Sequence, residues 1–261
     1  MDYKRSLRQI SYYAPPIVLI MAIIGIWQFA TYEFKIPVYL LPGPVAIWKA
    51  LTQSNINWSR EFLATLYEVL TGFFLAVAVS IPLAIVLVYS KWFNRAVYPI
   101  ILALQILPKV AIAPLLFILL GFNDTPRILV VFLISFFPII IDTVTGLNAL
   151  DPNHVELMRS LGASNFQIFG MARFRNGLPF IYSGLKVSIT LALVGAVVAE
   201  FVQANNGLGF VLIAELTQIG TATAFAALTL LTLMGIMLYI VVLVLEAITI
   251  PWYAKSKQVG G

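Results

Sequence analysis

Glu156-Leu157-Met158-Arg159-Ser160-Leu161-Gly162 is a polar, helix-forming segment, and the pair Leu178-Pro179 follows it further along the chain. The segment lies between two strongly apolar stretches, each long enough to cross a membrane. A polar helix in this position is expected on one face of the bilayer, where a soluble partner can contact it.

The same region carries start and stop signals for two short helices. Asp151 is a suitable N-cap, and Pro152 suits the first helical position, where a missing N–H costs nothing. Gly162 can end the first helix. Ser164, with Gln167 three residues later, forms a capping-box pattern for a second helix. The sequence therefore predicts a helix, a tight turn and a second helix over residues 151–171, within a loop of about residues 148–178.

Apolar residues recur at helical spacing in both of these predicted helices. They are Val155, Leu157, Met158 and Leu161 in the first, and Phe166, Ile168, Phe169 and Met171 in the second. An apolar face outside the bilayer must be covered by something. The chain's own membrane helices and a partner protein are both suitable, and spacing alone favours neither.

The composition is that of an integral membrane protein. Of the 261 residues 61% are apolar and 10% charged, and the mean hydropathy is +0.96, which a soluble surface cannot accommodate. Crossing a membrane takes about 20 apolar residues. Six stretches meet this requirement: Ala14–Tyr32, Val69–Tyr89, Val97–Gly121, Ile128–Leu147, Pro179–Val202 and Ala224–Ile250.

We therefore expect an all-α protein with about six transmembrane helices, in which residues 1–261 form a single transmembrane domain. The sequence has no Cys and one His, so we expect neither a disulfide nor a metal site.

Lys and Arg residues are distributed unequally between the two sides that these spans define. Ten lie on one side: Lys4, Arg5, Arg8, Lys91, Arg95, Arg159, Arg173, Arg175, Lys255 and Lys257. Four lie on the other: Lys35, Lys49, Arg60 and Arg127. Positive residues in short loops favour the cytoplasm, so both termini and the 148–178 loop are predicted to be cytoplasmic. This topology accounts for the net charge of +5, and no nucleic-acid partner is expected.

Lys109 lies deepest among the ionisable residues of the predicted spans, about 18 Å along the third span from Val97. It directly follows Pro108, which interrupts a helix, and irregular backbone at that depth is tolerated only beside protein or a cavity. We predict that Pro108 and Lys109 line a translocation path. A span that begins later than Val97 would instead leave Lys109 near the cytoplasmic interface. Solvation or a local ion pair is expected for the others, which lie nearer to span ends: Glu68, Asp142, Lys186, Glu200 and Glu246.

The fifth span has a face of small residues, which lets helices approach closely in lipid. Its members are Gly184, Ser188, Ala192, Gly195, Ala196 and Ala199. We expect Gly184, Gly195 and Ala196 to serve helix packing or dimerisation. The spacing does not distinguish a second copy of the chain from a helix of the same chain.

Two turns are predicted on the outer side. Leu41-Pro42-Gly43-Pro44 precedes a short helix through Leu51, and Asn205-Asn206-Gly207-x-Gly209 precedes another at Phe210–Gln218. Each either caps the helix ends or contacts a docking protein.

Several motifs together resemble the permease subunits of binding-protein-dependent ABC importers. The first, which is similar to their EAA loop, is Glu156-x-x-x-x-x-Gly162-Ala163-Ser164 with Leu178-Pro179-x-x-x-x-Gly184-Leu185-Lys186. The others are Pro108-Lys109-Val110-Ala111-x-Ala113-Pro114-Leu115, Gly121-Phe122, and Ala199-Glu200 with Asn206-Gly207-Leu208-Gly209. The resemblance covers about residues 61–252. The nearest branch includes permeases for nitrate, sulfonate, taurine and bicarbonate, and those proposed for pyrimidine precursors of thiamine and for riboflavin.

The resemblance implies a type I importer permease, a non-catalytic subunit of the bacterial inner membrane that pairs with a second copy of itself. Two copies of a separate ATPase would hold ATP and Mg, and an extracytoplasmic binding protein would deliver the solute. The loop would dock on the ATPase through Glu156, Leu157, Met158, Leu161, Gly162, Ala163 and Phe166. The third and fifth spans would line the pathway, which adds Ser188 and Ala192 to Pro108 and Lys109. No cofactor is implied on this chain, which has no G-x-x-x-x-G-K-[ST] phosphate loop.

The loop departs from the family pattern at four positions. Leu157 and Met158 stand where the motif has two alanines, and Ala172 and Arg175 replace the usual isoleucine and first proline. These changes concern the detailed contacts with the partner rather than the existence of the loop.

Other transport and enzyme classes fit the sequence less well. A secondary transporter driven by an ion gradient would need ion ligands near the midplane, usually in a repeated fold, and neither a repeat nor a midplane carboxylate is found. An intramembrane hydrolase would need a base near a nucleophile, but His154 is predicted in the cytoplasmic loop. The solute is expected to be a small organic molecule or anion. The Pro108-Lys109-Val110-Ala111 sequence is less similar to the sulfonate and taurine permeases, which slightly favours an organic, heterocyclic solute.

Overall fold

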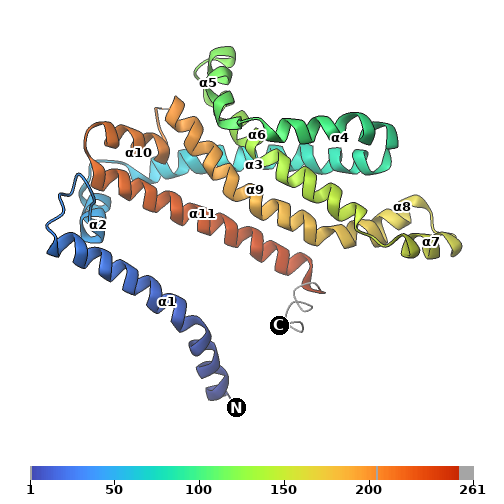
Figure 1. Cartoon of the computed structure of the whole chain (residues 1–261), viewed down its shortest axis with the longest axis horizontal. Coiled ribbons are helices and arrows are strands. Elements are labelled where there is room, and N and C mark those ends of the chain that lie inside the picture. The colour runs from blue at the N-terminus through green and yellow to red at the C-terminus, as the bar shows by residue number, and fades with distance from the viewer. Residues whose placement is uncertain (1, 204, 253–261) are drawn as a thin grey trace. The chain divides into compact units, whose positions relative to one another are not determined.

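The structure is a computed structural model that describes residues 2–203 and 205–252. All regular elements in these residues are helical, which confirms the predicted all-α class (Figure 1). The first half of the chain contains α1 (Asp2–Glu33), α2 (Pro44–Gln53), α3 (Trp58–Tyr89), α4 (Lys91–Ile106), α5 (Lys109–Leu120) and α6 (Asp124–Asn148). The second half contains α7 (Pro152–Ser160), α8 (Asn165–Ile168), the π-helical segment η1 (Phe169–Arg173), α9 (Phe174–Val202), α10 (Leu208–Thr217) and α11 (Thr221–Thr249).

Five helices of the described chain are long and apolar enough to cross a membrane, and a bent pair of helices gives a sixth span if the pair crosses as one. The five are Ala14–Glu33, Trp58–Tyr89, Asp124–Asn148, Asn165–Val202 and Thr221–Thr249. The bent pair consists of α4 and α5. The expectation of about six spans is therefore confirmed. The predicted cytoplasmic residues Lys255 and Lys257 lie outside the described residues.

The third span differs from its predicted bounds. Its helix begins at Lys91 rather than Val97, ends at Ile106 and resumes at Lys109, with an angle of 96° between the two parts. Pro108 explains the break, because proline lacks an N–H and holds the preceding residue, Leu107, in an extended conformation. The predicted interruption at Pro108 is thus confirmed. The helix itself begins before Val97, not after it.

The described residues form two compact units. One takes its residues from Met1–Trp58 and Val211–Thr229, and the other from Ser59–Phe210 and Leu230–Gly261. In the first unit, α1 and α2 are tied together because the Val45 N–H donates to Gln28 Oε1 at 3.0 Å. The predicted helix from Pro44 to Leu51 is present as α2, with Pro44 in its first turn.

The second unit is organised by the packing of α6 against α9. Small residues allow it: a Cβ added at Gly184 would lie 3.0 Å from the Pro138 carbonyl oxygen, and one at Gly195 would lie 3.1 Å from Val131 Cα. Both neighbours belong to α6 of the same chain. The small-residue face therefore packs within the chain, which resolves the alternative that the sequence left open.

Two serines form hydrogen bonds between α6 and α9 at the centre of this contact. Ser188 Oγ donates to the Ser135 carbonyl oxygen at 2.7 Å, and Ser135 Oγ donates back to the Ser188 carbonyl oxygen at 3.4 Å. Ser188 and Ala192 have no exposed surface. Their side chains face α6 rather than an open path, so the structure contradicts the prediction that these two residues line the pathway. Gly184, Gly195 and Ala196 are buried in the same contact, as packing residues.

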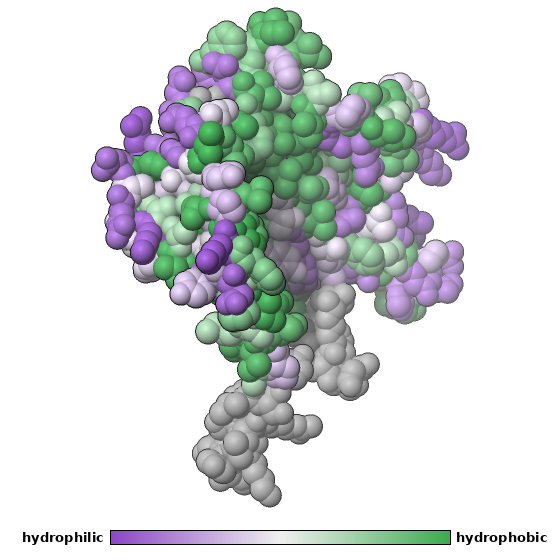
Figure 2. All heavy atoms as spheres, turned by 60° about the vertical axis from the view of Figure 1, so that its left-hand side comes forward, coloured by the Kyte–Doolittle hydropathy of each residue, from purple (hydrophilic) through white to green (hydrophobic). Residues whose placement is uncertain are grey.

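Other faces of the chain are apolar and open, as lipid contact requires. On α11, Leu233, Ile236 and Ile240 are each at least half exposed. Figure 2 shows hydrophobic residues over much of the visible surface and polar residues gathered in patches. Such a surface is stable only against hydrocarbon or another protein.

Gly184→Leu tests the packing of α6 against α9. The added side chain has no room, so we expect the free energy of unfolding in detergent to fall by about 1–3 kcal/mol, the usual cost of overpacking. Gly25→Leu is the matched control, because a Cβ at Gly25 would meet nothing within 4 Å. Equal stability of the two variants would contradict the packing described.

Candidate coupling site and polar network

The connection between α6 and α9 is built as the sequence predicts. The Asp151 side chain accepts the Asn153 N–H at 2.8 Å, which caps α7, and Pro152 is the first residue of that helix. α7 is followed by Gly162, whose φ of +81° is a left-handed conformation that favours glycine. The predicted sharp corner at Gly162 is therefore confirmed.

The second helix starts at the predicted capping box. Ser164 Oγ accepts the Gln167 N–H at 3.3 Å, and Gln167 Oε1 accepts the Ser164 N–H at 2.8 Å. This helix does not end in the loop, because α8 continues through η1 into α9 as one helix, Asn165–Val202. The helices α7 and α8 and the turn at Gly162 between them, which we call the corner, thus connect α6 to α9, the two helices that pack most closely.

Most of the apolar face of this corner is open. Val155 and Ile168 are buried and hold the corner against the rest of the unit. Leu157, Leu161 and Phe166 are instead exposed by 58%, 78% and 84%. Of the other predicted coupling residues, Glu156 and Gly162 are exposed, and Met158 and Ala163 are half-buried. The chain's own helices therefore do not cover this face, which favours a partner as its cover.

Aromatic contacts connect the corner to the end of α3. The Tyr89 and Phe169 rings meet edge to face with centroids 5.7 Å apart, and the Arg173 guanidinium lies 5.8 Å from the Tyr89 ring centroid. Phe169 also contacts Phe174, at 5.8 Å between centroids. Because η1 contributes to these contacts, a displacement of the corner would be transmitted to α3 as well as to α6 and α9.

At the break of the third span, Lys109 bridges α4 and α6. Its Nζ donates to the Gln105 carbonyl oxygen at 2.9 Å and lies 4.5 Å from the centre of the Phe137 ring. The first contact satisfies a carbonyl next to the break in the helix, and the second is a cation–π contact. Pro108 is exposed and Lys109 is half-buried. Both residues therefore lie at an irregular, accessible part of the span.

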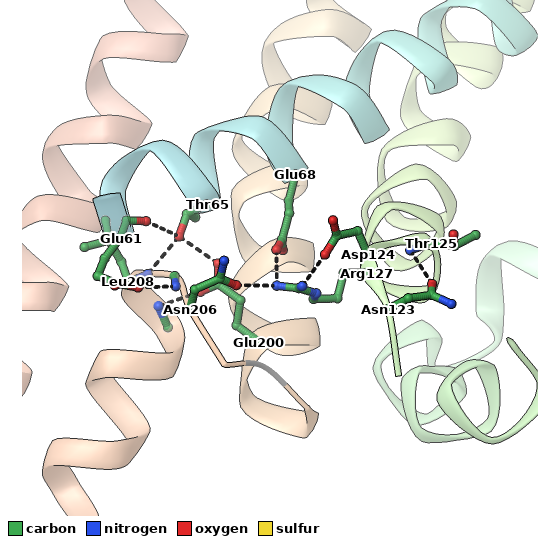
Figure 3. A network of polar contacts seen from close by, with 12 residues as sticks. Glu61, Thr65, Glu68, Asn123, Asp124, Thr125, Arg127, Glu200, Asn206 and Leu208 are labelled. Atoms are coloured by element: carbon green, nitrogen blue, oxygen red, sulfur yellow. Dashed lines mark hydrogen bonds and ion pairs between the residues drawn. The ribbon is translucent and has the colours of Figure 1, made fainter. Parts of the chain in front are cut away.

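A network of charged and polar side chains joins α3, α6 and α9 at the end opposite the corner (Figure 3). Its centre is Arg127, which is 8% exposed. The guanidinium pairs with Glu68 at 2.5 Å, donates to Asn206 Oδ1 at 3.0 Å and also pairs with Asp124. A buried charge is stable only with such partners.

The turn that leads into α10 is held by the same network. The successive backbone N–H groups of residues 207, 208 and 209 donate to Glu61 Oε2, Thr65 Oγ1 and Glu200 Oε2, at 2.6, 2.8 and 2.5 Å. Thr65 Oγ1 in turn donates to Glu200 Oε1 at 2.7 Å. Gly207 is required here, since its φ is +109° and a Cβ would collide with the Glu200 carboxylate. The predicted Asn-Gly turn is confirmed, and α10 begins two residues before the expected start at Phe210.

Sequence reasoning found only part of this network. Local pairing was one expectation for Glu68, and Glu68 is paired with Arg127, 59 residues away. The second pair in the spans, Lys186 with Glu246 at 2.7 Å, also meets the expectation of a local partner. The spacing of Glu61, Thr65 and Glu68 along one face of α3 was the signal that could have revealed a polar helix face. No group of three or more His, Cys, Asp or Glu residues in the described chain is arranged to hold a metal ion.

Apolar helices long enough to cross a membrane, one of them interrupted at Pro108, define a multi-pass membrane protein. The chain belongs to the family of binding-protein-dependent transport system inner membrane components, whose family model matches residues 69–255. It is therefore a multi-pass inner-membrane permease.

Several relatives of known name are similar over nearly the whole chain. The formylaminopyrimidine transport permease protein ThiX of Halalkalibacterium halodurans is 31% identical, over 92% of this chain and 96% of its own length. The riboflavin transport system permease protein RibX of Chloroflexus aurantiacus is 32% identical, over 96% and 95%. The taurine transport system permease protein TauC of Escherichia coli is 25% identical, over 88% and 86%. These matches confirm the family that the motifs indicated.

Thr65→Val tests the polar network with little change of shape. It leaves the Leu208 N–H and one Glu200 oxygen without their partner, so we expect a loss of about 1–3 kcal/mol in the free energy of unfolding. Thr145→Val is the control, because Thr145 is exposed and bonds only to a carbonyl of its own helix. A loss of stability in Thr65→Val no larger than in the control would contradict the network.

Proposed function

We propose that this chain is the membrane subunit of an ATP-driven importer, working as a homodimer with two copies of a separate ATPase. The observation that carries the proposal is the exposed apolar corner of α7 and α8. Leu157, Leu161 and Phe166 cost free energy in water. Leu157 and Leu161 lie between the candidate spans Asp124–Asn148 and Asn165–Val202, and Phe166 lies in the first turn of the second. A groove on a soluble partner suits a short helix with such residues.

The position of the corner supports a role in transmitting force. α7 follows α6 along the chain and α8 continues into α9, so a push on the corner acts on both helices at once. Because α6 and α9 are closely packed, they would move together rather than slide apart. In this proposal, closure of the ATPases on ATP moves the corner, and α6 and α9 carry that movement through the membrane.

The distribution of positive charges predicts which side of the membrane each end of the helix pair faces. The corner would face the cytoplasm, where ATP is available, and the polar network would face outward. The turn at residues 205–209 would then lie on the side where a solute-binding protein delivers its ligand, and the sequence predicts the outer side for α2 as well. Trp48 on α2 is 67% exposed, which suits a docking contact.

The proposed pathway passes the break of the third span. Pro108 is exposed there, and Lys109 is held by a carbonyl and an aromatic ring rather than by a carboxylate. This leaves a positive charge able to meet a polar solute in the path. Ser188 and Ala192 are not included, because they are buried against α6.

We further propose a small heterocyclic organic solute. The relatives named for formylaminopyrimidine and riboflavin are 31% and 32% identical, whereas the relative named for taurine is 25% identical. The first two compounds contain flat, nitrogen-containing rings. The sequence around Pro108 favours the same branch of the family.

Phe166→Ala tests the coupling proposal. Buried aromatic anchors at interfaces often contribute 2 kcal/mol or more, so we expect at least about tenfold weaker association with the ATPase and a matching loss of ATP-dependent uptake. Phe122→Ala is the control, since Phe122 is 73% exposed but lies outside the corner, between α5 and α6. The proposal fails if Phe166→Ala binds the ATPase and supports uptake as well as the control does.

Lys109→Cys tests the pathway in a chain that has no other cysteine. We expect a charged thiol reagent to label it at least about tenfold faster than Ile240→Cys on α11, because only a hydrated thiol forms the reactive thiolate. This comparison needs no knowledge of the solute. Equally slow labelling at both positions would show that Lys109 does not border water.

A further inference from the structure

A groove of about 500 Å³ lies where α9 begins and α11 has just ended. Its lining consists of Arg175, Asn176, Pro179, Phe180, Ser183 and Trp252. The groove combines one guanidinium, one amide and one hydroxyl with two aromatic rings. Neither the proposed coupling nor the proposed pathway uses it.

Two polar contacts between α9 and α11 fix one side of the groove. Lys186 Nζ pairs with Glu246 Oε2 at 2.7 Å, and Thr249 Oγ1 donates to the Tyr182 hydroxyl at 2.8 Å. These contacts place the end of α11, and with it Trp252, beside the first turns of α9. The groove is therefore part of the folded unit rather than a gap between loose ends.

Arg175 supplies the only cationic group in this lining. Within the described residues it forms no ion pair, and its side chain is exposed. Of the charged groups nearby, Lys186 is already paired with Glu246, and the Asp142 carboxylate lies beside the Ser183 hydroxyl. Ser183 lies about 12 Å along the helix from Arg175, so the acidic group is at the far end of the groove. The Arg175 end is thus suited to an anion.

Residues at both sides of the groove are of the types that are common at the headgroup level of a membrane. Trp252 comes three residues after the end of α11 and is 52% exposed, and tryptophan at such a position is typical of the membrane interface. Arg175 and Asn176 precede the predicted start of the fifth span at Pro179. Arg173, Lys255 and Lys257 add positive charge to the same stretches of sequence.

We propose that this groove binds the phosphate group of an anionic phospholipid. Arg175 and Asn176 donate hydrogen bonds to the phosphate oxygens, and the Trp252 and Phe180 rings pack against the glycerol and the upper acyl chains. Arginine binds phosphate oxygens in a forked geometry, and basic pockets between membrane helices are suited to lipid headgroups. The choice of the inner leaflet rests on the orientation given under the proposed function, whereas the binding itself does not.

Native mass spectrometry of the full chain in detergent tests this proposal. Palmitoyl-oleoyl phosphatidylglycerol is the probe, and phosphatidylcholine with the same acyl chains is the comparison lipid. We expect Arg175→Ala to weaken phosphatidylglycerol binding about fivefold, the usual effect of one basic residue at an anionic surface. Arg175→Lys should retain part of the affinity. Arg95→Ala, an exposed arginine on the same predicted side, should bind like the unchanged chain.

Three results would overturn the proposal. The first is equal phosphatidylglycerol binding by Arg175→Ala and Arg95→Ala. The second is full displacement of the lipid by inorganic phosphate at equal concentration, which would indicate a site for a soluble anion. The third is loss of ATPase association in Arg175→Ala with lipid binding unchanged, which would assign the groove to the protein interface. None of these measurements depends on uptake, so a failure here is distinguishable from a failure of the proposed transport function.

Discussion

The close approach of α6 and α9 is the contact on which the second unit depends. In hydrocarbon there is no hydrophobic gain from bringing two helices together, so shape and hydrogen bonding must hold them. At Gly184 and Gly195 the two backbones lie so close together that even an added Cβ atom would crowd the backbone of α6. The reciprocal bonds of Ser135 and Ser188 add polar contacts that no water competes for. A larger residue at these positions would separate the helices along their length.

The two ends of the α6–α9 pair differ in structure. At one end, Arg127 and its carboxylate partners tie the start of α6 to α3, and Glu200 ties the end of α9 to the turn before α10. At the other end, the pair is joined by the exposed corner of α7 and α8. α6 has 25 residues, so the two ends are separated by about 37 Å, which exceeds the hydrocarbon thickness of a bilayer. A load on the corner can therefore reach the far side without passing through a flexible loop.

Local signals in the sequence were sufficient for much of this arrangement. The caps at Asp151 and Ser164 and the corner at Gly162 depend on neighbouring residues, and each was found where it was predicted. Contacts between distant residues were not accessible in this way. Arg127 and Glu68 are far apart in sequence, and nothing in one sequence identifies their pairing. The small-residue face showed a periodicity but not its partner, so Ser188 was assigned to a pathway although it packs on α6. The bend at Pro108 was foreseen, but its angle depends on how α5 packs against α6 and α9.

The central claim is that work done by an ATPase enters this chain through the corner of α7 and α8. Cross-linking from Leu161→Cys in the assembled transporter tests it most directly, because the chain has no other cysteine. The account predicts a covalent adduct with the ATPase subunit, and protection of the thiol from a membrane-impermeant reagent applied outside intact cells. Labelling from the outside, with no ATPase adduct, would contradict both the orientation of the corner and its role.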